Sequence, residues 1–237
     1  MSATNRKIAV PESYADIPLR DLQKIRSLEG DEEFVAIKVI EILTGITGKE
    51  VLHMRRNDRD VILGLISEAL SVETTKLIER FTYDGVEYGF NPNLNEMTYG
   101  EFVDLETYQL DFKNIHKMLA VLYRPIVKSY DTYYTIEDYE GSAKYSGVMQ
   151  NIPSHIALGC LVFFYALGKE LLSNSLRSLE EALAKSPSDK KNLEESGVGT
   201  LQLQALQETM LEGLKELQDL ILNPALPRLR TRLINMN

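Results

Sequence analysis

Three residues in the segment 43–51, "LTGITGKEV", have types that bind phosphate. Gly45, Gly48 and Lys49 match part of a P-loop, in which backbone N–H groups of glycines and a lysine hold nucleotide phosphates. The spacing departs from that motif, because two residues rather than four precede the Gly-Lys pair. Glu50 also stands where a Ser or Thr would bind the metal ion, and its carboxylate would repel phosphate. We therefore interpret this segment as a joint between two helices.

The residue types around the joint support this interpretation. Gly45 suits the left-handed residue that ends a helix. Thr47 followed by Glu50 forms the capping box of a new helix, and Ile46 with Val51 occupies the two positions of a hydrophobic staple.

The same start signal recurs at "MTYGEF". Thr98 and Glu101 form the capping box, and Met97 with Phe102 forms the expected staple. These signals predict helices that begin near residues 48 and 99.

The histidines and the cysteine are not spaced as metal ligands or as a catalytic pair. His116 and His155 lie beside apolar helical residues and are expected to pack or cap, whereas His53 adjoins a solvated charge cluster. Cys160 is the only cysteine, which excludes an intramolecular disulfide and favours a reducing compartment. Its apolar neighbours predict a small buried side chain.

Three acidic clusters occur, at residues 31–33, 58–60 and 137–140. The first is explained by the dipole at a helix start. The last lacks the spaced oxygen ligands and the turn glycine of a calcium loop, so a solvated loop is expected. No nucleophile elbow, Cys/His pair or Rossmann glycine pattern is present, and we predict no cofactor, no metal and no enzymatic activity.

The tyrosine-rich stretch 123–145 is the best candidate for a contact surface. Tyrosine is favoured both at protein interfaces and at the edge of a core, so both roles stay open. An enzyme with a diffuse site at 123–140 is the competing hypothesis. The tyrosines predicted to bind a partner are Tyr130, Tyr133, Tyr134 and Tyr139.

The elements predicted to position these candidates make up a mainly α fold with a small antiparallel β element, of the α+β class. Asp84-Gly85 predicts a hairpin over 77–90, with strands at 77–83 and 86–90, and "YYTIEDY" at 133–139 is the expected third strand. Apolar periodicity and start signals predict the helices. They are 17–28 after Asp16, 31–44 (mostly buried), one from 48, 58–70 with Asn57 and Asp60 at its start, one from 99, one ending near Tyr123 before Pro125, a short one in 140–153, and 153–184.

The C-terminal part divides into a polar linker at 186–200 and a helix at 201–222 with a basic tail, which leaves residues 1–185 as the globular domain. The last helix carries an apolar seam, which either folds back on helix 153–184 as a long C-terminal helical hairpin or packs against other subunits. The seam residues proposed for partner binding are Leu203, Leu206, Met210 and Leu217.

Charge and hydropathy limit the partners. The net charge of −9 and the pI near 5.0 make a general grip on nucleic acid unlikely. Arg228, Arg230 and Arg232 form a local exception, which is either a polar helix end or a contact with a nucleic acid or a partner. The longest apolar run, 156–168, is shorter than the roughly 20 residues of a membrane span, so a buried helix is expected.

Several phrases follow one another in order: "IPLRDLQKI", "EILTGITGKEVLHM", "YGFNPNLNEMTYGEFVDLETY", "NIHKMLAVLYRPI" and "IPSHIALGCLVFFYALGKELL". Over about residues 14–175, the chain resembles proteins encoded in the structural gene clusters of tailed bacteriophages. The "ILTG…EV" segment also resembles the helical start of phage tail assembly chaperones.

This resemblance implies a non-enzymatic role in phage morphogenesis through protein–protein binding, as a tail assembly chaperone-like factor. The alternative is a permanent virion component of the head–tail connector region or an internal protein. The implied partners are other phage structural proteins or further copies of the chain, with no membrane. The implied location is the host cytoplasm during assembly, or the virion if the protein is retained.

Overall fold

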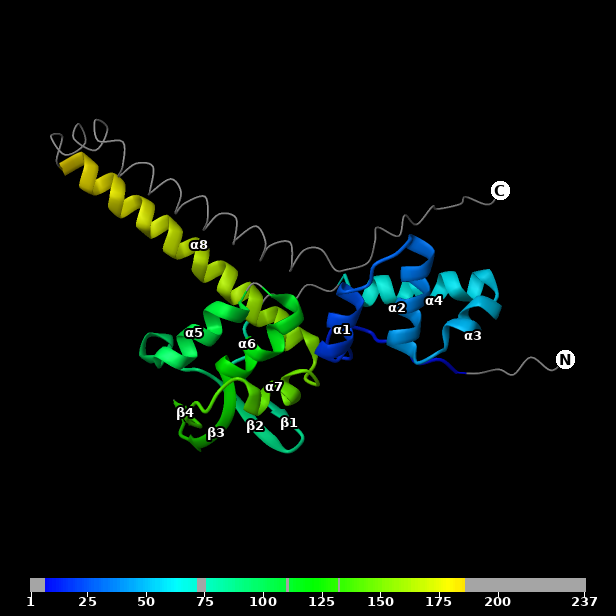
Figure 1. Ribbon diagram of the computed structural model, residues 1–237, viewed down its shortest axis with the longest axis horizontal. Helices are drawn as coiled ribbons and strands as arrows, with labels where there is room; N and C mark the ends of the chain where they lie inside the picture. The colour runs from blue at the N-terminus through cyan, green and yellow to red at the C-terminus, as the bar shows by residue number, and fades with distance from the viewer. Residues whose placement is uncertain (1–6, 72–75, 110, 132, 186–237) are drawn as a thin grey trace.

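The computed structural model describes residues 7–71, 76–109, 111–131 and 133–185 (Figure 1). It confirms a mainly helical α+β fold with a four-stranded antiparallel sheet. The helices within these ranges are α1 (Leu19–Arg26), α2 (Glu32–Thr44), α3 (Gly48–His53), α4 (Arg56–Ala69), α5 (Tyr99–Tyr108), α6 (Ile115–Leu122), α7 (Ala143–Met149) and α8 (Ser154–Lys185).

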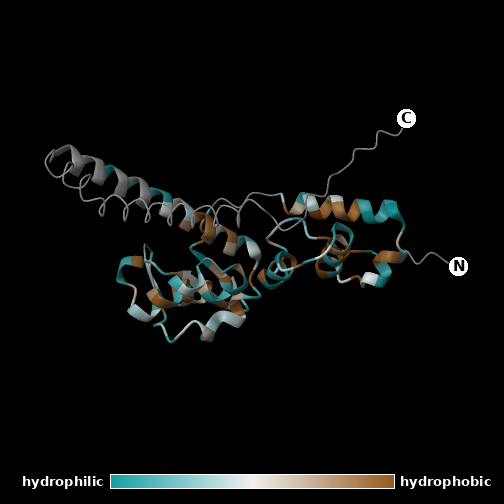
Figure 2. Ribbon diagram, turned by 45° about the horizontal axis from the view of Figure 1, so that its top comes forward, coloured by the Kyte–Doolittle hydropathy of each residue, from teal (hydrophilic) through white to brown (hydrophobic). Residues whose placement is uncertain are grey.

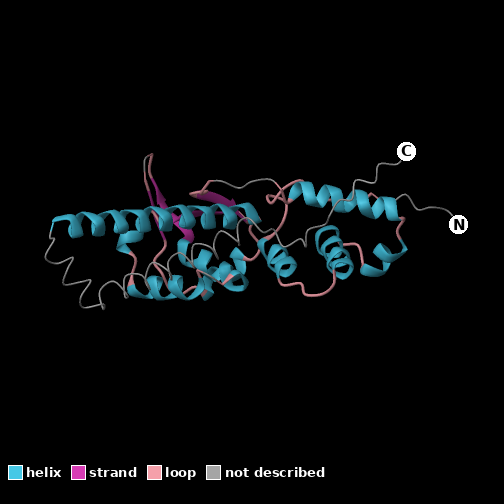
Figure 3. Ribbon diagram, turned by 90° about the horizontal axis from the view of Figure 1, so that it is seen from above, coloured by secondary structure: helices cyan, strands magenta, loops and turns pink. Residues whose placement is uncertain are grey.

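The sheet has the strand order β1-β2-β3-β4, so its strands follow one another as in the sequence. They are gathered in one region of the molecule, beside α8 (Figure 3). Asp84 and Gly85 both have positive φ, as the predicted two-residue turn between β1 and β2 requires. The strands are β1 (Arg80–Tyr83), β2 (Val86–Phe90), β3 (Tyr123–Ser129) and β4 (Tyr134–Ile136).

Strand β3 was not predicted, because Pro125 was interpreted as the end of a helix. The helix does end at Leu122, but the chain continues directly as a strand that pairs with both β2 and β4. Pro125 lies opposite Tyr88, and the register with β4 shifts between Ile126 and Lys128, which is the kind of irregularity that admits a proline. The expected third strand is therefore β4, and it pairs with β3 and not with the hairpin.

The joint at 43–51 is built as expected. Gly45 ends α2 in the left-handed conformation with φ 70°, and Thr47 and Glu50 form the complete capping box of α3. Ile46 and Val51 are both buried. The second capping box, Thr98 with Glu101, is also present at the start of α5.

Several local predictions were wrong. The expected staple at α5 is not buried, because Glu101 turns toward the interior and leaves Phe102 55% exposed. Asp16 accepts hydrogen bonds from the N–H groups of Glu12 and Ser13, so it closes the preceding turn and does not cap α1. Likewise α4 begins at Arg56 without a side-chain cap, because Asn57 lies inside its first turn.

Helix α2 is also less buried than predicted. It buries one face, formed by Val35, Ala36, Val39 and Ile40, while Phe34 is exposed and Ile37 is only partly covered. The apolar residues outside the buried face thus remain near the surface.

The starts of α1 and α8 hold the helical layers together. The N–H groups of Leu19 and Arg20 donate to the carbonyls of Ile152 and Gln150, at 2.9 and 2.8 Å. In return, Ser154 donates to Ile17 through both its backbone N–H, at 2.8 Å, and its hydroxyl, at 2.6 Å. The first N–H groups of each helix, which have no partner within their own helix, therefore donate to carbonyls that precede the other helix.

Helix α8 begins in the core and then extends beyond the body of the molecule. Its first turns carry the apolar run, with Ile156, Ala157, Cys160 and Leu161 buried, and Figure 2 shows this hydrophobic part against the body. Its later turns extend away from the body (Figure 1). The predicted helix 153–184 is confirmed, whereas the second arm of the expected hairpin lies outside the described residues. Within the described ranges, no helix is both long and apolar enough to cross a membrane.

Two Gly→Ala substitutions test how closely the chain just before β1, at Lys76, packs against α8. A Cβ at Gly159 would lie 2.3 Å from the Lys76 carbonyl oxygen, whereas a Cβ at Gly64 in α4 meets nothing within 4 Å. We expect Gly159→Ala to lower the free energy of unfolding by about 1–3 kcal/mol through overpacking. Gly64→Ala should raise it by about 0.5–1 kcal/mol, because alanine favours the helix. Urea denaturation would measure both changes, and equal stability of the two variants would contradict this close packing.

Candidate functional site

The four candidate tyrosines fall into two groups. Tyr130 and Tyr133 are exposed and stack on each other between β3 and β4, with ring centroids 4.3 Å apart. Tyr134 is buried, and its hydroxyl donates to the carbonyls of Phe90, at 2.7 Å, and Glu79, at 3.3 Å. The Tyr139 hydroxyl donates to the Asp104 carboxylate. Only the first pair therefore presents free aromatic surface, and its role in binding stays a prediction.

The candidates at the C-terminus cannot be placed. The seam and the basic tail lie outside the described residues, so their predicted roles remain untested. These residues are Leu203, Leu206, Met210, Leu217, Arg228, Arg230 and Arg232.

In the segment 43–51, which partly matches a P-loop, the polar groups are engaged in hydrogen bonds within the joint between α2 and α3. The Gly48 N–H, which would face a phosphate, donates to Glu41 Oε1 at 3.3 Å, and the other oxygen of Glu41 pairs with Lys38 at 2.6 Å. Glu50 closes the capping box with Thr47. The carboxylates here stabilise the joint between α2 and α3.

Two of the three acidic residues of the 137–140 cluster, Glu137 and Glu140, form ion pairs. Lys144 Nζ contacts Glu137 at 2.7 Å and Glu140 at 2.8 Å, and the Tyr145 hydroxyl also donates to Glu137. These hydrogen bonds lower the pKa of Glu137, that from Lys144 having the largest effect. Among the described residues, no group of three or more His, Cys, Asp or Glu is arranged to hold a metal ion.

The Cys160 thiol and two of the imidazoles have environments that favour their neutral forms. Cys160 is fully buried, and desolvation raises the pKa of its thiol. His116 lies 3.1 Å from Gln23 Nε2 and 3.3 Å from Gln150 Nε2, and burial lowers its pKa. Burial likewise lowers the pKa of His155.

A buried ion pair joins α5 to β3, and sequence reasoning missed it. Arg124 Nη2 lies 2.6 Å from Glu101 Oε1, and the two side chains are 7% and 4% exposed. Glu101 Oε2 simultaneously accepts from the N–H and hydroxyl of Thr98, so one carboxylate completes a helix cap and neutralises a buried cation. The capping box signalled Glu101, but nothing local signalled Arg124 as its partner.

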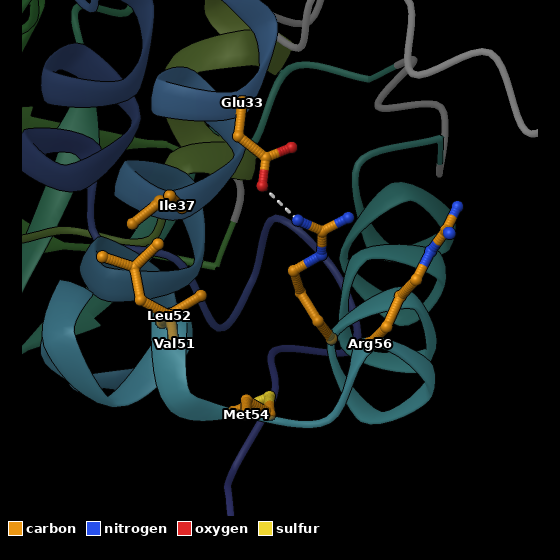
Figure 4. Close-up of a pocket in the computed structure, with 7 residues that line it drawn as sticks. Glu33, Ile37, Val51, Leu52, Met54 and Arg56 are labelled. Carbon is orange, nitrogen blue, oxygen red and sulfur yellow. Dashed lines mark hydrogen bonds and ion pairs between the residues drawn. The ribbon is translucent and has the colours of Figure 1, made fainter.

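A pocket with an apolar floor and a charged rim lies between α2, α3 and α4 (Figure 4). Its volume is about 240 Å³. Glu33 and Arg59 form an ion pair across it, and Leu52 at its edge is 67% exposed. The lining residues are Glu33, Ile37, Val51, Leu52, Met54, Arg56 and Arg59.

The pocket forms because the chain turns back at the joint between α2 and α3, and because α2 leaves some of its apolar side chains only partly buried. The turn after Gly45 folds α3 back against α2, and Ile37 remains between them as part of the floor. Helix α4 contributes Arg56 and Arg59 to the lining of the pocket, and Figure 4 shows Arg56 across from Ile37 and Leu52. Sequence reasoning predicted the joint but interpreted the arginines only as a solvated cluster.

The buried pair can be tested by removing one partner. Glu101→Ala leaves the Arg124 charge buried without compensation, and we expect a loss of about 3–5 kcal/mol in the free energy of unfolding. The matched control, Glu140→Ala, removes an exposed ion pair and should cost less than about 1 kcal/mol. Denaturant unfolding would compare them. If the two losses are equal, the pair does not join α5 to β3, whereas recovery of stability in Glu101→Met/Arg124→Met would support the buried-charge explanation.

No family model, curated protein or solved structure matches this chain.

Proposed function

We propose that this protein is a non-enzymatic factor of bacteriophage morphogenesis that binds other virion proteins in the manner of a tail assembly chaperone. The observation that carries the proposal is the pocket between α2, α3 and α4. An exposed leucine beside a partly apolar cavity offers a contact that a protein partner can cover. The proposed setting is the cytoplasm of the infected host.

The size of the pocket favours a protein side chain as its occupant. Sites for small molecules and cofactors commonly enclose about 300–1,000 Å³. A cavity of about 150 Å³ holds one benzene ring. A pocket of about 240 Å³ therefore suits a single aromatic or large aliphatic side chain. Such a side chain, anchored in a pocket, typically contributes much of the energy of a protein interface.

The position of the pocket connects it with the resemblance to phage proteins. The segment "EILTGITGKEVLHM" is one of the phrases that resemble phage structural proteins, and its "ILTG…EV" part resembles the helical start of phage tail assembly chaperones. It forms the end of α2, all of α3 and the turn that follows. Val51, Leu52 and Met54 of this segment line the pocket. The resembling residues thus include those proposed to contact the partner.

A charge placed at the edge of the pocket tests this proposal. Leu52→Glu changes an exposed side chain, so the fold should persist while the apolar contact is lost. We expect tagged Leu52→Glu to recover at least about tenfold less phage structural protein from infected cells than wild type, as loss of one interface anchor predicts. Quantitative mass spectrometry would identify the recovered tail and head proteins.

Val61→Glu provides the matched control. Val61 is an exposed apolar residue of α4 that does not line the pocket, and the substitution adds the same charge. Equal recovery of phage structural proteins by Leu52→Glu and wild type would overturn the proposed use of the pocket.

The stage at which the protein acts can be determined from purified particles. A chaperone-like factor dissociates before assembly ends, so we expect its peptides to be depleted in mature virions relative to infected-cell lysate. Mass spectrometry with labelled reference peptides would measure the ratio. A constant copy number per virion would identify a permanent structural component instead.

A further inference from the structure

We propose that the pocket binds helix α5 of a second copy of this chain, so that copies associate head to tail. This inference rests on the binding role proposed for the pocket and names one occupant. It starts from an apolar surface on α5 that no described residue covers. Tyr99 is 83% exposed, the largest exposure among the large apolar side chains that the structure describes, and Phe102 and Val103 lie beside it on the helix.

The spacing of these residues makes one continuous stripe. Residues three and four apart on a helix are neighbours, so Tyr99, Phe102 and Val103 share a face of α5. The stripe exists because the buried ion pair turns Glu101 inward and leaves the adjacent aromatic residues outside. An exposed aromatic side chain on a rigid helix is well suited to fill a preformed pocket.

Charge favours a match between α5 and the pocket. The segment 94–109 contains four acidic residues and no Lys or Arg, and Glu96 and Glu106 are exposed. At the pocket, Arg56 is 80% exposed, and its contact with Asp60 is 3.7 Å long. An acidic helix with an aromatic anchor thus complements an apolar pocket with an arginine at its rim.

The stacked tyrosines are a poorer match for the pocket. Tyr130 and Tyr133 already contact each other face to face. The exposed side chains near them include Lys128, and the Arg80 side chain donates to Ser129. Around this pair the cations are mixed with the exposed Asp131, whereas the segment 94–109 carries acidic residues and no Lys or Arg. Helix α5 is therefore the better charge match for Arg56.

The two surfaces cannot meet within one molecule. Helix α5 lies at one end of the body along the long axis, and α3 and α4 lie at the other (Figure 1). A contact between them must therefore join different copies. Because the two surfaces differ, the contact is heterologous and repeats from copy to copy, giving a ring or an open filament. One short helix in one pocket buries a small area, so the association is reversible and weak.

Mixing two blocked variants of the full chain tests this arrangement. Tyr99→Arg removes the anchor and keeps the pocket, whereas Leu52→Glu blocks the pocket and keeps α5. Sedimentation velocity should show wild type forming larger species as its concentration rises. Each variant alone should bind its own copies about 30-fold more weakly, as expected for loss of an interface anchor. An equimolar mixture should restore association but stop at a one-to-one dimer, because only one intact pair of surfaces remains.

Tyr133→Arg is the matched control, because it changes another exposed aromatic residue and should associate as wild type does. The inference is overturned if wild type stays monomeric, if the blocked variants associate as strongly as wild type, or if their mixture forms no dimer. Loss of phage-protein recovery by Leu52→Glu with unchanged self-association would leave the proposed function standing and reject α5 as the occupant.

Discussion

The reciprocal hydrogen bonding between the starts of α1 and α8 is the constraint on which the arrangement of the molecule depends. A helix leaves its first N–H groups without partners, and burying them unpaired is costly. Here the carbonyls before α8 receive the N–H groups of α1, and the carbonyls before α1 receive those of α8. Residues more than a hundred positions apart are thereby fixed side by side, with the helices α1–α4 on one side of this contact and the sheet with α5–α7 on the other (Figure 1).

The polar groups of the interior reinforce this framework. Buried tyrosine hydroxyls donate to carbonyls distant in sequence: Tyr14 to Leu70, Tyr123 to Ile78 and Tyr134 to Phe90. Burial is the main reason that the pKa of Tyr123 is raised, so this hydroxyl stays a proton donor. The ion pair between Glu101 and Arg124 likewise fixes α5 against β3, although Nε and Nη1 of Arg124 make no hydrogen bond. These residues determine which side chains are left to face solvent.

Two of the apolar surfaces that remain exposed lie at opposite ends of the body (Figure 1). One end carries the pocket, whose floor comes from apolar residues that α2 could not bury completely. The other carries the aromatic stripe of α5, displaced outward by the inward turn of Glu101. Both surfaces thus arise from the way in which the core packs its apolar side chains and pairs its buried polar groups. Both have the mixture of apolar and charged groups that is found at protein interfaces.

The sequence by itself determined the local features. The capping boxes at Thr47 and Thr98, the left-handed Gly45 and the Asp84-Gly85 turn were all predicted correctly, because each depends on residues within about five positions of one another. Burial of Cys160 and the length of α8 also followed from an uninterrupted apolar run.

Only the tertiary structure decided which of these elements meet. Strand β3 could not be foreseen, since a proline is disfavoured in helices and in central strands alike, and only the pairing with β2 and β4 defines this strand. The partner of Glu101, the burial of Tyr134 and the pocket required residues distant in sequence to be brought together. Local periodicity determines the type of an element and one of its faces, whereas the choice of partner depends on long-range burial and on satisfying every buried polar group at once.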